Sequence, residues 1–245
     1  MYKLGLIGYP ISHSFSKKYF QEKFEKENIK NYEYDLYPLE KIEDFPLLLQ
    51  KNPELVGLNV TIPHKQNVIS YLDEMDSFAQ KIGAVNTIKI ENGKTKGYNT
   101  DYVGFMNSLK TWIGDTTKID ALILGTGGAS KAVQVALQTL QIPFRLASRN
   151  GDEENILSYN SLNERIIKKY QLIINTTPIG MYPNIEDFPK IPYQYLTQEH
   201  FLYDLVYNPE ETMFLKKGEK QKSKTKNGLE MLYLQAEAAW NIWNK

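Results

Sequence analysis

The stretch Ala121–Leu140, ALILGTGGASKAVQVALQTL, decides the fold predicted for this chain. Its first four residues form an apolar run typical of a buried strand, and the glycine turn Gly125–Gly128 follows directly. Ser130–Leu140 then reads as a helix, and Phe144–Ala147 as a second strand. A strand, a glycine-rich turn, a helix and a second strand in this order form the βαβ unit of a dinucleotide-binding fold.

The glycine turn has the residue types that a pyrophosphate site needs. Gly125 permits the tight turn, Gly127 lets the backbone approach a pyrophosphate, and the N-terminus of the following helix presents free N–H groups. The run departs from G-x-G-x-x-G because Ser130 stands at the third glycine position. A glycine turn can also merely reverse the chain, so the strand and the helix around it carry the prediction of a nucleotide site.

The residues after the second strand indicate which nucleotide would bind there. Sites for NAD usually place Asp or Glu at this point, whereas an arginine suits the 2′-phosphate of NADP. Arg149 follows Ala147-Ser148 here, and the first acidic residue comes only at Asp152. Arg149 could therefore stack on adenine and pair with the phosphate, the alternative being an ordinary surface arginine.

Strands and helices also alternate in the first hundred residues. Apolar patterns predict strands at Leu4–Ile7, Tyr32–Tyr37 and Leu55–Val60, and a helix over 16–28. Asn92-Gly93, between Thr87–Ile90 and Lys94–Tyr98, is a strong signal for a hairpin. This alternation predicts an α/β protein with a parallel-type sheet in this part of the chain as well.

Further elements are expected in the second half of the chain. Phe105–Trp112 is predicted to be a helix that links the two halves, and Leu172–Asn175 and Phe201–Asp204 are predicted strands. The lysine-rich stretch Lys216–Lys226 is interpreted as a solvated linker. Gly228–Trp243 is a long amphipathic helix that could pack back on the N-terminal half.

Composition limits the class of protein. The 245 residues, 42% of them hydrophobic, suffice for two modest domains or one large one, and 29 basic against 29 acidic residues create no global field that would attract nucleic acid. The chain has no cysteine, which excludes disulfides and thiolate chemistry and suits a reducing cytoplasm. No apolar run approaches the ~18 residues of a membrane helix. His13, His64 and His200 are not at metal-ligand spacing, so we expect no metal and no membrane.

Lys65, in the run Leu58–Lys65 (LNVTIPHK), is the candidate catalytic residue. Asn59 and Thr61 alternate out of the preceding strand toward the same end. A half-buried lysine is costly without a partner, and Asp101 is the natural candidate. Such a pair could pass the proton of a substrate hydroxyl and stabilise the developing alkoxide, the alternative being a structural salt bridge.

Ser14 and Ser16 carry hydroxyls at alternate positions just before a predicted helix. In an extended segment they would lie on one side, where hydroxyls and the start of the helix could hold a carboxylate. Simple capping of the helix is the alternative.

Taken together, the motifs of this chain resemble those of the shikimate dehydrogenase family over nearly its whole length. In order, they are Gly8–Ser16 (GYPISHSFS), Asn59–Lys65 (NVTIPHK), Gly83–Thr87 (GAVNT), Asn99–Asp101 (NTD), Gly125–Ser130 (GTGGAS), Asn175–Met181 (NTTPIGM), Tyr203–Pro209 (YDLVYNP) and Asn227–Leu232 (NGLEML). Any one of these motifs would be weak, whereas eight in this order are specific.

The resemblance implies an N-terminal α/β substrate domain, a Rossmann-type NADP domain and a C-terminal helix that returns to the first domain. The expected boundaries are residues 1–101 with 227–245 for the substrate domain and 102–226 for the cofactor domain. The implied activity is the reversible NADPH-dependent reduction of 3-dehydroshikimate to shikimate in aromatic amino-acid biosynthesis, by a cytoplasmic monomer or homodimer. We also expect the two domains to meet across a cleft, because hydride transfer needs the reacting carbons roughly 3–3.5 Å apart.

The same resemblance assigns roles to individual residues. Lys65 would be the acid/base, with Asp101 as its partner. The implied substrate-binding residues are Ser14, Ser16 and Tyr207 on the carboxylate side and Thr61, Asn86, Asp101 and Gln235 at the hydroxyls. The implied cofactor-binding residues are Gly125, Gly127, Gly128, Ala129, Ser130, Ser148, Arg149, Asn150, Leu205 and Gly228, of which Leu205 and Gly228 would line the nicotinamide.

One departure from the family and two rival functions follow. Many NADP-dependent members carry a second basic residue four positions after the arginine, and this chain has Glu153 there, which would weaken its preference for NADP.

The nearest rival function is that of an NAD-dependent quinate/shikimate dehydrogenase. Against this rival, Ser14 and Ser16 favour the shikimate ring and Arg149 favours NADP. A non-catalytic nicotinamide-nucleotide-sensing protein would need neither Lys65 nor Asp101.

Overall fold

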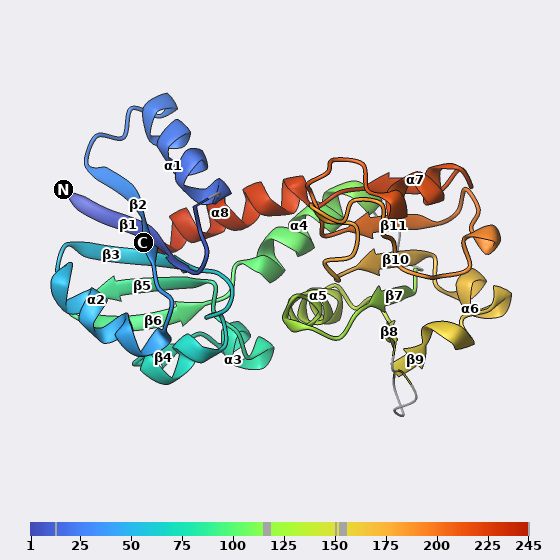
Figure 1. Cartoon of the computed structure of the whole chain (residues 1–245), viewed down its shortest axis with the longest axis horizontal. Coiled ribbons are helices and arrows are strands. Elements are labelled where there is room, and N and C mark those ends of the chain that lie inside the picture. Colours follow the sequence, from blue (N-terminus) through green and yellow to red (C-terminus); the bar gives the residue numbers. More distant parts are fainter. Residues whose placement is uncertain (13, 115–118, 150, 152–155, 245) are drawn as a thin grey trace. The chain divides into compact units, whose positions relative to one another are not determined.

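The computed structural model describes residues 1–12, 14–114, 119–149, 151 and 156–244 and divides into two units (Figure 1). Unit 1 comprises Met1–Thr100 and Ala236–Lys245, and unit 2 comprises Asp101–Gln235. The last helix, α8 (Leu229–Trp243), has residues in both units.

Unit 1 is built on a mixed six-stranded sheet with the order β2-β1-β3-β5-β6-β4. The strands are β1 (Tyr2–Gly8), β2 (Tyr32–Pro38), β3 (Leu55–Val60), β4 (Glu74–Met75), β5 (Thr87–Glu91) and β6 (Lys94–Tyr98). The parallel pairing predicted from the sequence is confirmed for β1 with β2 and β3, whereas β5 runs antiparallel to both β3 and β6. The predicted hairpin is also confirmed, because Asn92 and Gly93 have φ of 52° and 75°, as a two-residue type I′ turn requires.

Short helices and the end of α8 cover this sheet. The helices are α1 (Phe15–Lys26), η1 (Ile42–Asp44), α2 (Phe45–Lys51), η2 (Asn67–Tyr71) and α3 (Ser77–Ile82). Phe20 and Tyr34 share one buried cluster with Trp243 from α8, and the Trp243 indole N–H donates to the carbonyl of Ile88 at 2.9 Å. The prediction that the C-terminal helix packs back on the first part of the chain is therefore confirmed.

Unit 2 contains a fully parallel six-stranded sheet with the order β12-β11-β10-β7-β8-β9. Its strands are β7 (Ala121–Leu124), β8 (Phe144–Ser148), β9 (Ile156–Ser158), β10 (Leu172–Asn175), β11 (Phe201–Asp204) and β12 (Lys224–Lys226). Its helices are α4 (Asp101–Ile113), α5 (Gly128–Thr139), η3 (Tyr159–Ser161), α6 (Glu164–Lys169), η4 (Tyr193–Tyr195), α7 (Met213–Glu219) and the first half of α8. This strand order is that of a doubly wound Rossmann fold.

Both faces of the second sheet are buried, which explains the unbroken apolar run at its centre. Ala121 and Ile123 of β7 belong to one hydrophobic cluster, and Leu122 and Leu124 belong to another. Successive side chains of a strand point to opposite faces, so the two clusters lie on opposite sides of the sheet.

The interpretation of Lys216–Lys226 as a solvated linker is wrong. Helix α7 covers its first part, and Lys224–Lys226 forms β12, which pairs in parallel with β11. The Lys224 ammonium lies 4.4 Å from the centre of the Phe201 ring. Lysines suit this strand because β12 is an edge strand, where charge discourages pairing with a second chain.

The pairing of β8 with β9 was not predicted, and it bears on the cofactor site. Ser148 of β8 lies opposite Ser158 of β9 in a parallel register. The connection, residues 149–155, is shorter than the dozen or more residues that join most parallel strands. Because of this register, Arg149 and Tyr159 leave two adjacent strands side by side.

Candidate cofactor and substrate residues

The three glycines after β7 have different local surroundings. Gly125 has a φ of +106°, and a Cβ atom there would lie 2.8 Å from Cγ2 of Thr177. Gly127 is the N-cap of α5, and a Cβ at Gly127 or Gly128 would meet nothing within 4 Å. Gly125 is therefore needed for the turn, whereas Gly127 and Gly128 leave open space at a helix N-terminus, where a pyrophosphate fits.

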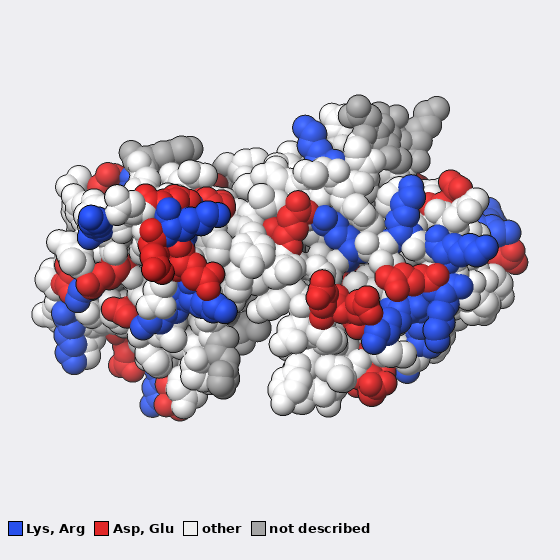
Figure 2. All heavy atoms as spheres, turned by 90° about the horizontal axis from the view of Figure 1, so that it is seen from above, with Lys and Arg blue, Asp and Glu red and all other residues white. Residues whose placement is uncertain are grey.

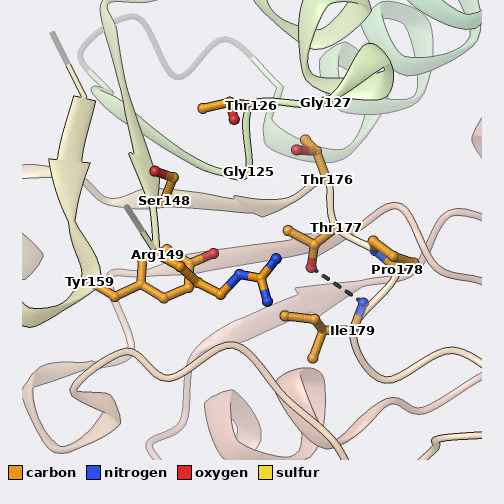
Figure 3. A pocket seen from close by; sticks show the side chains of 10 residues that line it. All are labelled: Gly125, Thr126, Gly127, Ser148, Arg149, Tyr159, Thr176, Thr177, Pro178 and Ile179. Atoms are coloured by element: carbon orange, nitrogen blue, oxygen red, sulfur yellow. Dashed lines mark hydrogen bonds between the residues drawn. The ribbon is translucent and has the colours of Figure 1, made fainter. Parts of the chain in front are cut away.

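Gly125 and Gly127 border a pocket with a volume of about 470 Å³ at the carboxyl edge of the sheet, close to where the strand order reverses between β7 and β10 (Figure 3). Its lining residues are Gly125, Thr126, Gly127, Ser148, Arg149, Tyr159, Thr176, Thr177, Pro178 and Ile179. Among these described residues, Arg149 is the only one with a charged side chain. The volume falls in the range of about 300–1,000 Å³ of small-molecule sites. Glycine backbone, hydroxyls and one guanidinium suit an anionic ligand such as NADP.

Two of the cofactor candidates at the end of β8 lie in the described part of the chain. Arg149 is exposed and Ser148 is half-buried, and both line the pocket. Asn150 and Glu153 lie outside the described residues. Tyr159 projects into the same pocket (Figure 3) and was missed by the sequence analysis, because the short strand β9 that places it was not recognised.

Side-chain hydrogen bonds fix the turn that forms another wall of the pocket. Asn175 Oδ1 accepts from the backbone N–H of Thr177 at 3.1 Å and from its hydroxyl at 2.7 Å. The Thr177 hydroxyl oxygen accepts from the N–H of Ile179 at 3.3 Å (Figure 3). The Thr176 hydroxyl donates to the carbonyl of Leu124 at 2.8 Å. This turn is thereby tied to β7, the strand that enters the glycine loop.

Beneath this turn lies a buried carboxylate that the sequence analysis did not assign. Asp204 accepts hydrogen bonds from Asn175 Nδ2 at 2.9 Å, from the N–H of Val206 at 3.0 Å and from the hydroxyl of Thr212 at 2.6 Å. Burial raises the pKa of Asp204 to about 6, although these hydrogen bonds act in the opposite direction. Only the tertiary neighbours of Asp204 distinguish it from an ordinary strand-end aspartate.

The remaining cofactor candidates are closely packed. A Cβ at Gly228 would lie 2.2 Å from the carbonyl oxygen of Leu205, so this position accommodates only glycine. Ala129 and Ser130 lie in the first turn of α5, and the buried Ser130 hydroxyl accepts from Gln134 Nε2 at 3.2 Å. A small, hydrogen-bonded serine therefore replaces the third glycine without disturbing the helix.

Lys65 follows β3 and is half-buried. Its carbonyl oxygen accepts from the N–H of Val85 at 2.7 Å. On the preceding residue, His64 is buried and its Nε2 lies 2.6 Å from the carbonyl of Leu39, which agrees with a structural role. Thr61 is half-buried and donates from its N–H to the carbonyl of Ile7 at 2.9 Å. These contacts fix the backbone around the candidate acid/base.

Asn86 is buried in a small network of polar side chains. Its Oδ1 accepts from the N–H of Thr100 at 2.6 Å, and its Nδ2 donates to the Thr100 hydroxyl at 2.9 Å. Part of its hydrogen-bonding capacity is thus used within the protein. Asp101, which directly follows Thr100, is the half-buried first residue of α4.

Ser14 and Ser16 are arranged differently from the extended segment that was expected. Ser14 is the N-cap of α1, and its hydroxyl oxygen accepts from the N–H of Ser16 at 3.1 Å. Ser14 therefore caps α1 through its hydroxyl oxygen. The expectation of alternation is wrong for Ser16, because Ser16 lies in the first turn of the helix, which begins at Phe15.

The two substrate candidates from the second half of the chain are partly accessible. Tyr207 is 40% exposed, and its remaining burial raises its pKa. Gln235 lies on α8, where its Nε2 donates to the carbonyl of Leu232 at 2.9 Å.

The surface carries charges of both signs. Figure 2 shows acidic and basic side chains interspersed over the face it draws. Among the described residues, no cluster of three or more His, Asp or Glu side chains is arranged to hold a metal ion. No helix in the described part of the chain is long and apolar enough to cross a membrane.

A doubly wound parallel sheet, with a glycine turn and an anion-suited pocket at its carboxyl edge, defines the class of dinucleotide-binding α/β proteins. The family of the shikimate dehydrogenase substrate binding domain matches residues 6–88. The shikimate dehydrogenase (NADP(+)) of Methanococcus maripaludis is 40% identical over 255 residues, which cover 98% of this chain and 91% of that protein. This chain belongs to the shikimate dehydrogenase family.

Two solved structures show the same fold with different ligands. Shikimate 5-dehydrogenase from Thermus thermophilus, in complex with NADP(H) and shikimate, is 28% identical with a TM-score of 0.87, and the match covers 99% of this chain and 93% of that one. Quinate dehydrogenase from Corynebacterium glutamicum, in complex with NAD, is 27% identical with a TM-score of 0.88, covering 99% of this chain and 93% of that one. The fold thus occurs with NADP(H) and shikimate in one structure and with NAD in the other.

Proposed function

We propose that this chain is an NADP-dependent oxidoreductase that interconverts 3-dehydroshikimate and shikimate, a step of aromatic amino-acid biosynthesis. The observation that carries the proposal is that the family likeness spans 98% of the chain, so that substrate residues and cofactor pocket occur together. A protein that had lost one of the two parts would match its relatives over only one unit.

NADP fits the pocket of unit 2, and NADPH, when bound, supplies the hydride that reduces the ketone. The open space at Gly127 and Gly128 and the start of α5 accommodate the pyrophosphate. Arg149, which lines the pocket, would hold the 2′-phosphate by charge. Leu205 and Gly228 would line the nicotinamide. Among the described residues that line the pocket there is no carboxylate, which favours the additional phosphate of NADP over the bare ribose of NAD.

Lys65 is the proposed acid/base, and Asp101 is its proposed partner. Lys65 donates a proton to the oxygen of 3-dehydroshikimate as the alkoxide develops, and it removes that proton in the reverse direction. The half-buried position of Lys65 and the fixed backbone around it support this role, because a positioned lysine transfers a proton more effectively than a mobile one.

The proposed substrate contacts come from several segments. Ser14, Ser16 and Tyr207 bind the carboxylate, and Thr61, Asn86, Asp101 and Gln235 bind the ring hydroxyls. The N-terminus of α1, which Ser14 caps, adds backbone N–H groups that favour an anion.

The proposed domains are residues 1–101 with 227–245 for the substrate and 102–226 for the cofactor. The unit that begins at Asp101 supports the first boundary. We further propose that the enzyme is cytoplasmic and acts as a monomer or homodimer.

The rival function with most support is a quinate/shikimate dehydrogenase that uses NAD, since one structural relative is a quinate dehydrogenase bound to NAD. Arg149 at the end of β8 argues against it, because a guanidinium gains little from a ribose that lacks the phosphate. A nucleotide sensor without catalysis would have no use for Lys65.

Four reactions separate these functions: shikimate or quinate, each mixed with NADP⁺ or NAD⁺ and the purified protein. The formation of reduced nicotinamide is followed by absorbance. We expect the highest kcat/KM with shikimate and NADP⁺. A higher value for quinate with NAD⁺ would support the dehydrogenase rival, and no reaction in any mixture would support the sensor.

A further inference from the structure

Two side chains leave the ends of the adjacent strands β8 and β9 and line the same pocket. Ser148 and Ser158 are paired in the parallel register of β8 and β9, so the next residues, Arg149 and Tyr159, are neighbours at the same edge of the sheet. Both line the pocket, and Figure 3 shows both side chains projecting into it. The parallel register of the two strands brings Tyr159 to this point.

The phenol of Tyr159 is suited to donate a hydrogen bond to an anion. The side chain is half-buried, and burial raises its pKa, so the hydroxyl keeps its proton at neutral pH. The charge of Arg149 acts on this pKa in the opposite direction and lowers it. In the part of the chain that the structure describes, the Tyr159 hydroxyl makes no hydrogen bond. Among the described residues, no acceptor therefore competes with a ligand for its proton.

The charges of the pocket leave a place for such a donor. A phosphate monoester carries a charge of about −1.5 to −2 at neutral pH. Arg149 is the only charged residue among the described residues that line the pocket, and it is exposed, so solvent weakens its attraction. A neutral phenol adds a directed hydrogen bond, which is stronger when its acceptor is ionised.

We propose that Tyr159 is a specificity-determining residue of the cofactor pocket, its hydroxyl donating a hydrogen bond to the 2′-phosphate that Arg149 holds by charge. The inference rests on the proposed function, because it concerns the cofactor of that reaction. The competing role for Tyr159 is packing alone, since its ring also lies against the hydrophobic cluster that contains Leu162 and Ile167. Phenylalanine would fill that role equally well.

The test measures binding of two fragments to Tyr159→Phe by calorimetry, without catalysis. Adenosine 2′,5′-bisphosphate carries the 2′-phosphate, and 5′-AMP lacks it. We expect Tyr159→Phe to bind the bisphosphate about ten-fold more weakly than the parent and to bind 5′-AMP equally well. Tyr195→Phe is the matched control, because Tyr195 is half-buried against the same cluster but does not line the pocket, and it should bind both fragments as the parent does.

Three results would overturn the inference: unchanged binding of both fragments by Tyr159→Phe, equal weakening of both, or a parent that does not prefer the bisphosphate. A separate assay of turnover with shikimate and saturating NADP⁺ distinguishes this failure from failure of the proposed function. A parent that does not prefer the bisphosphate over 5′-AMP but still oxidises shikimate refutes the role of Tyr159 alone. A parent that binds the bisphosphate through Tyr159 but oxidises no shikimate refutes the proposed reaction alone.

Discussion

The amide of Asn175 donates a hydrogen bond of 2.9 Å to Asp204 Oδ1, between residues paired at the carboxyl ends of β10 and β11. Both side chains are completely buried. On one side Asn175 holds the Thr177 turn of the cofactor pocket, and on the other Asp204 binds Thr212 and the N–H of Val206. One buried network therefore connects the wall of the cofactor pocket with the segment that leads to Tyr207.

This network predicts a pH dependence of stability that Asp204→Asn removes. Burial raises the pKa of Asp204 from 3.8 to about 6, so between these values the folded chain holds a proton that the unfolded chain has released. Its contribution to the free energy of unfolding is therefore present at low pH and declines as pH rises through this window, by up to about 3 kcal/mol. Asparagine stays neutral and can still accept from Asn175. In urea unfolding, the free energy of unfolding of Asp204→Asn should rise relative to that of the parent between about pH 4 and about pH 7.

Asp187→Asn is the control for this measurement, because Asp187 is an exposed carboxylate of the same unit. The free energy of unfolding of Asp187→Asn should differ from that of the parent by the same amount at about pH 4 and at about pH 7. A stability difference between Asp204→Asn and the parent that stays constant across the range would show that Asp204 ionises as freely in the folded protein as in the unfolded chain.

Arg149→Ala is expected to erode the preference for NADP. The loss of a charge-assisted contact of about 1.5–3 kcal/mol raises KM for NADP⁺ by one to two orders of magnitude, while kinetics with NAD⁺ change little. Steady-state kinetics with both cofactors measure the ratio. Arg165→Ala, which removes an exposed arginine of α6, is the matched control. If the parent already used NAD⁺ and NADP⁺ with equal kcat/KM, the assignment of Arg149 would be wrong.

Gly57→Ala is expected to weaken the packing of the end of α8 against the sheet of unit 1. A Cβ at position 57 would lie 2.3 Å from the Trp243 ring, so the helix or the strand has to shift. Such overpacking typically costs about 1–3 kcal/mol. Urea unfolding measures the free energy that Gly57→Ala costs in the parent and in a Trp243→Leu background. The cost should be smaller in the second background, because leucine is smaller than tryptophan and relieves part of the clash. Equal costs in both backgrounds would place the strain elsewhere.

Much of the fold could be predicted from the sequence because its central strands are buried on both faces. The predicted bounds of Ala121–Leu124, Leu172–Asn175 and Phe201–Asp204 are those of the structure, since short unbroken apolar runs with polar residues around them leave little ambiguity. Edge strands lack this signal. Lys224–Lys226 was hidden by its lysines, and Ile156–Ser158 by its shortness.

Some residues of the candidate site could likewise be predicted from the sequence, and others could not. Arg149 could be found because it directly follows a recognisable strand in a known unit. Tyr159 and Asp204 could not, because their surroundings depend on strand register and on partners far away in the sequence. The role of Ser14 depended on where α1 begins, and a shift of one or two residues decides whether a serine caps a helix or lies in an extended segment.

The most direct measurement compares consumption of NADPH with 3-dehydroshikimate by the parent and by Lys65→Ala. The parent should oxidise NADPH in a one-to-one ratio with the shikimate formed. Lys65→Ala should be about 10²–10⁴-fold slower in kcat, with little change in shikimate binding, because positioned proton transfer is lost. Lys81→Ala, an exposed lysine of α3, should keep the parental rate. A folded Lys65→Ala that retains the parental kcat, or a parent that consumes no NADPH, would contradict the account.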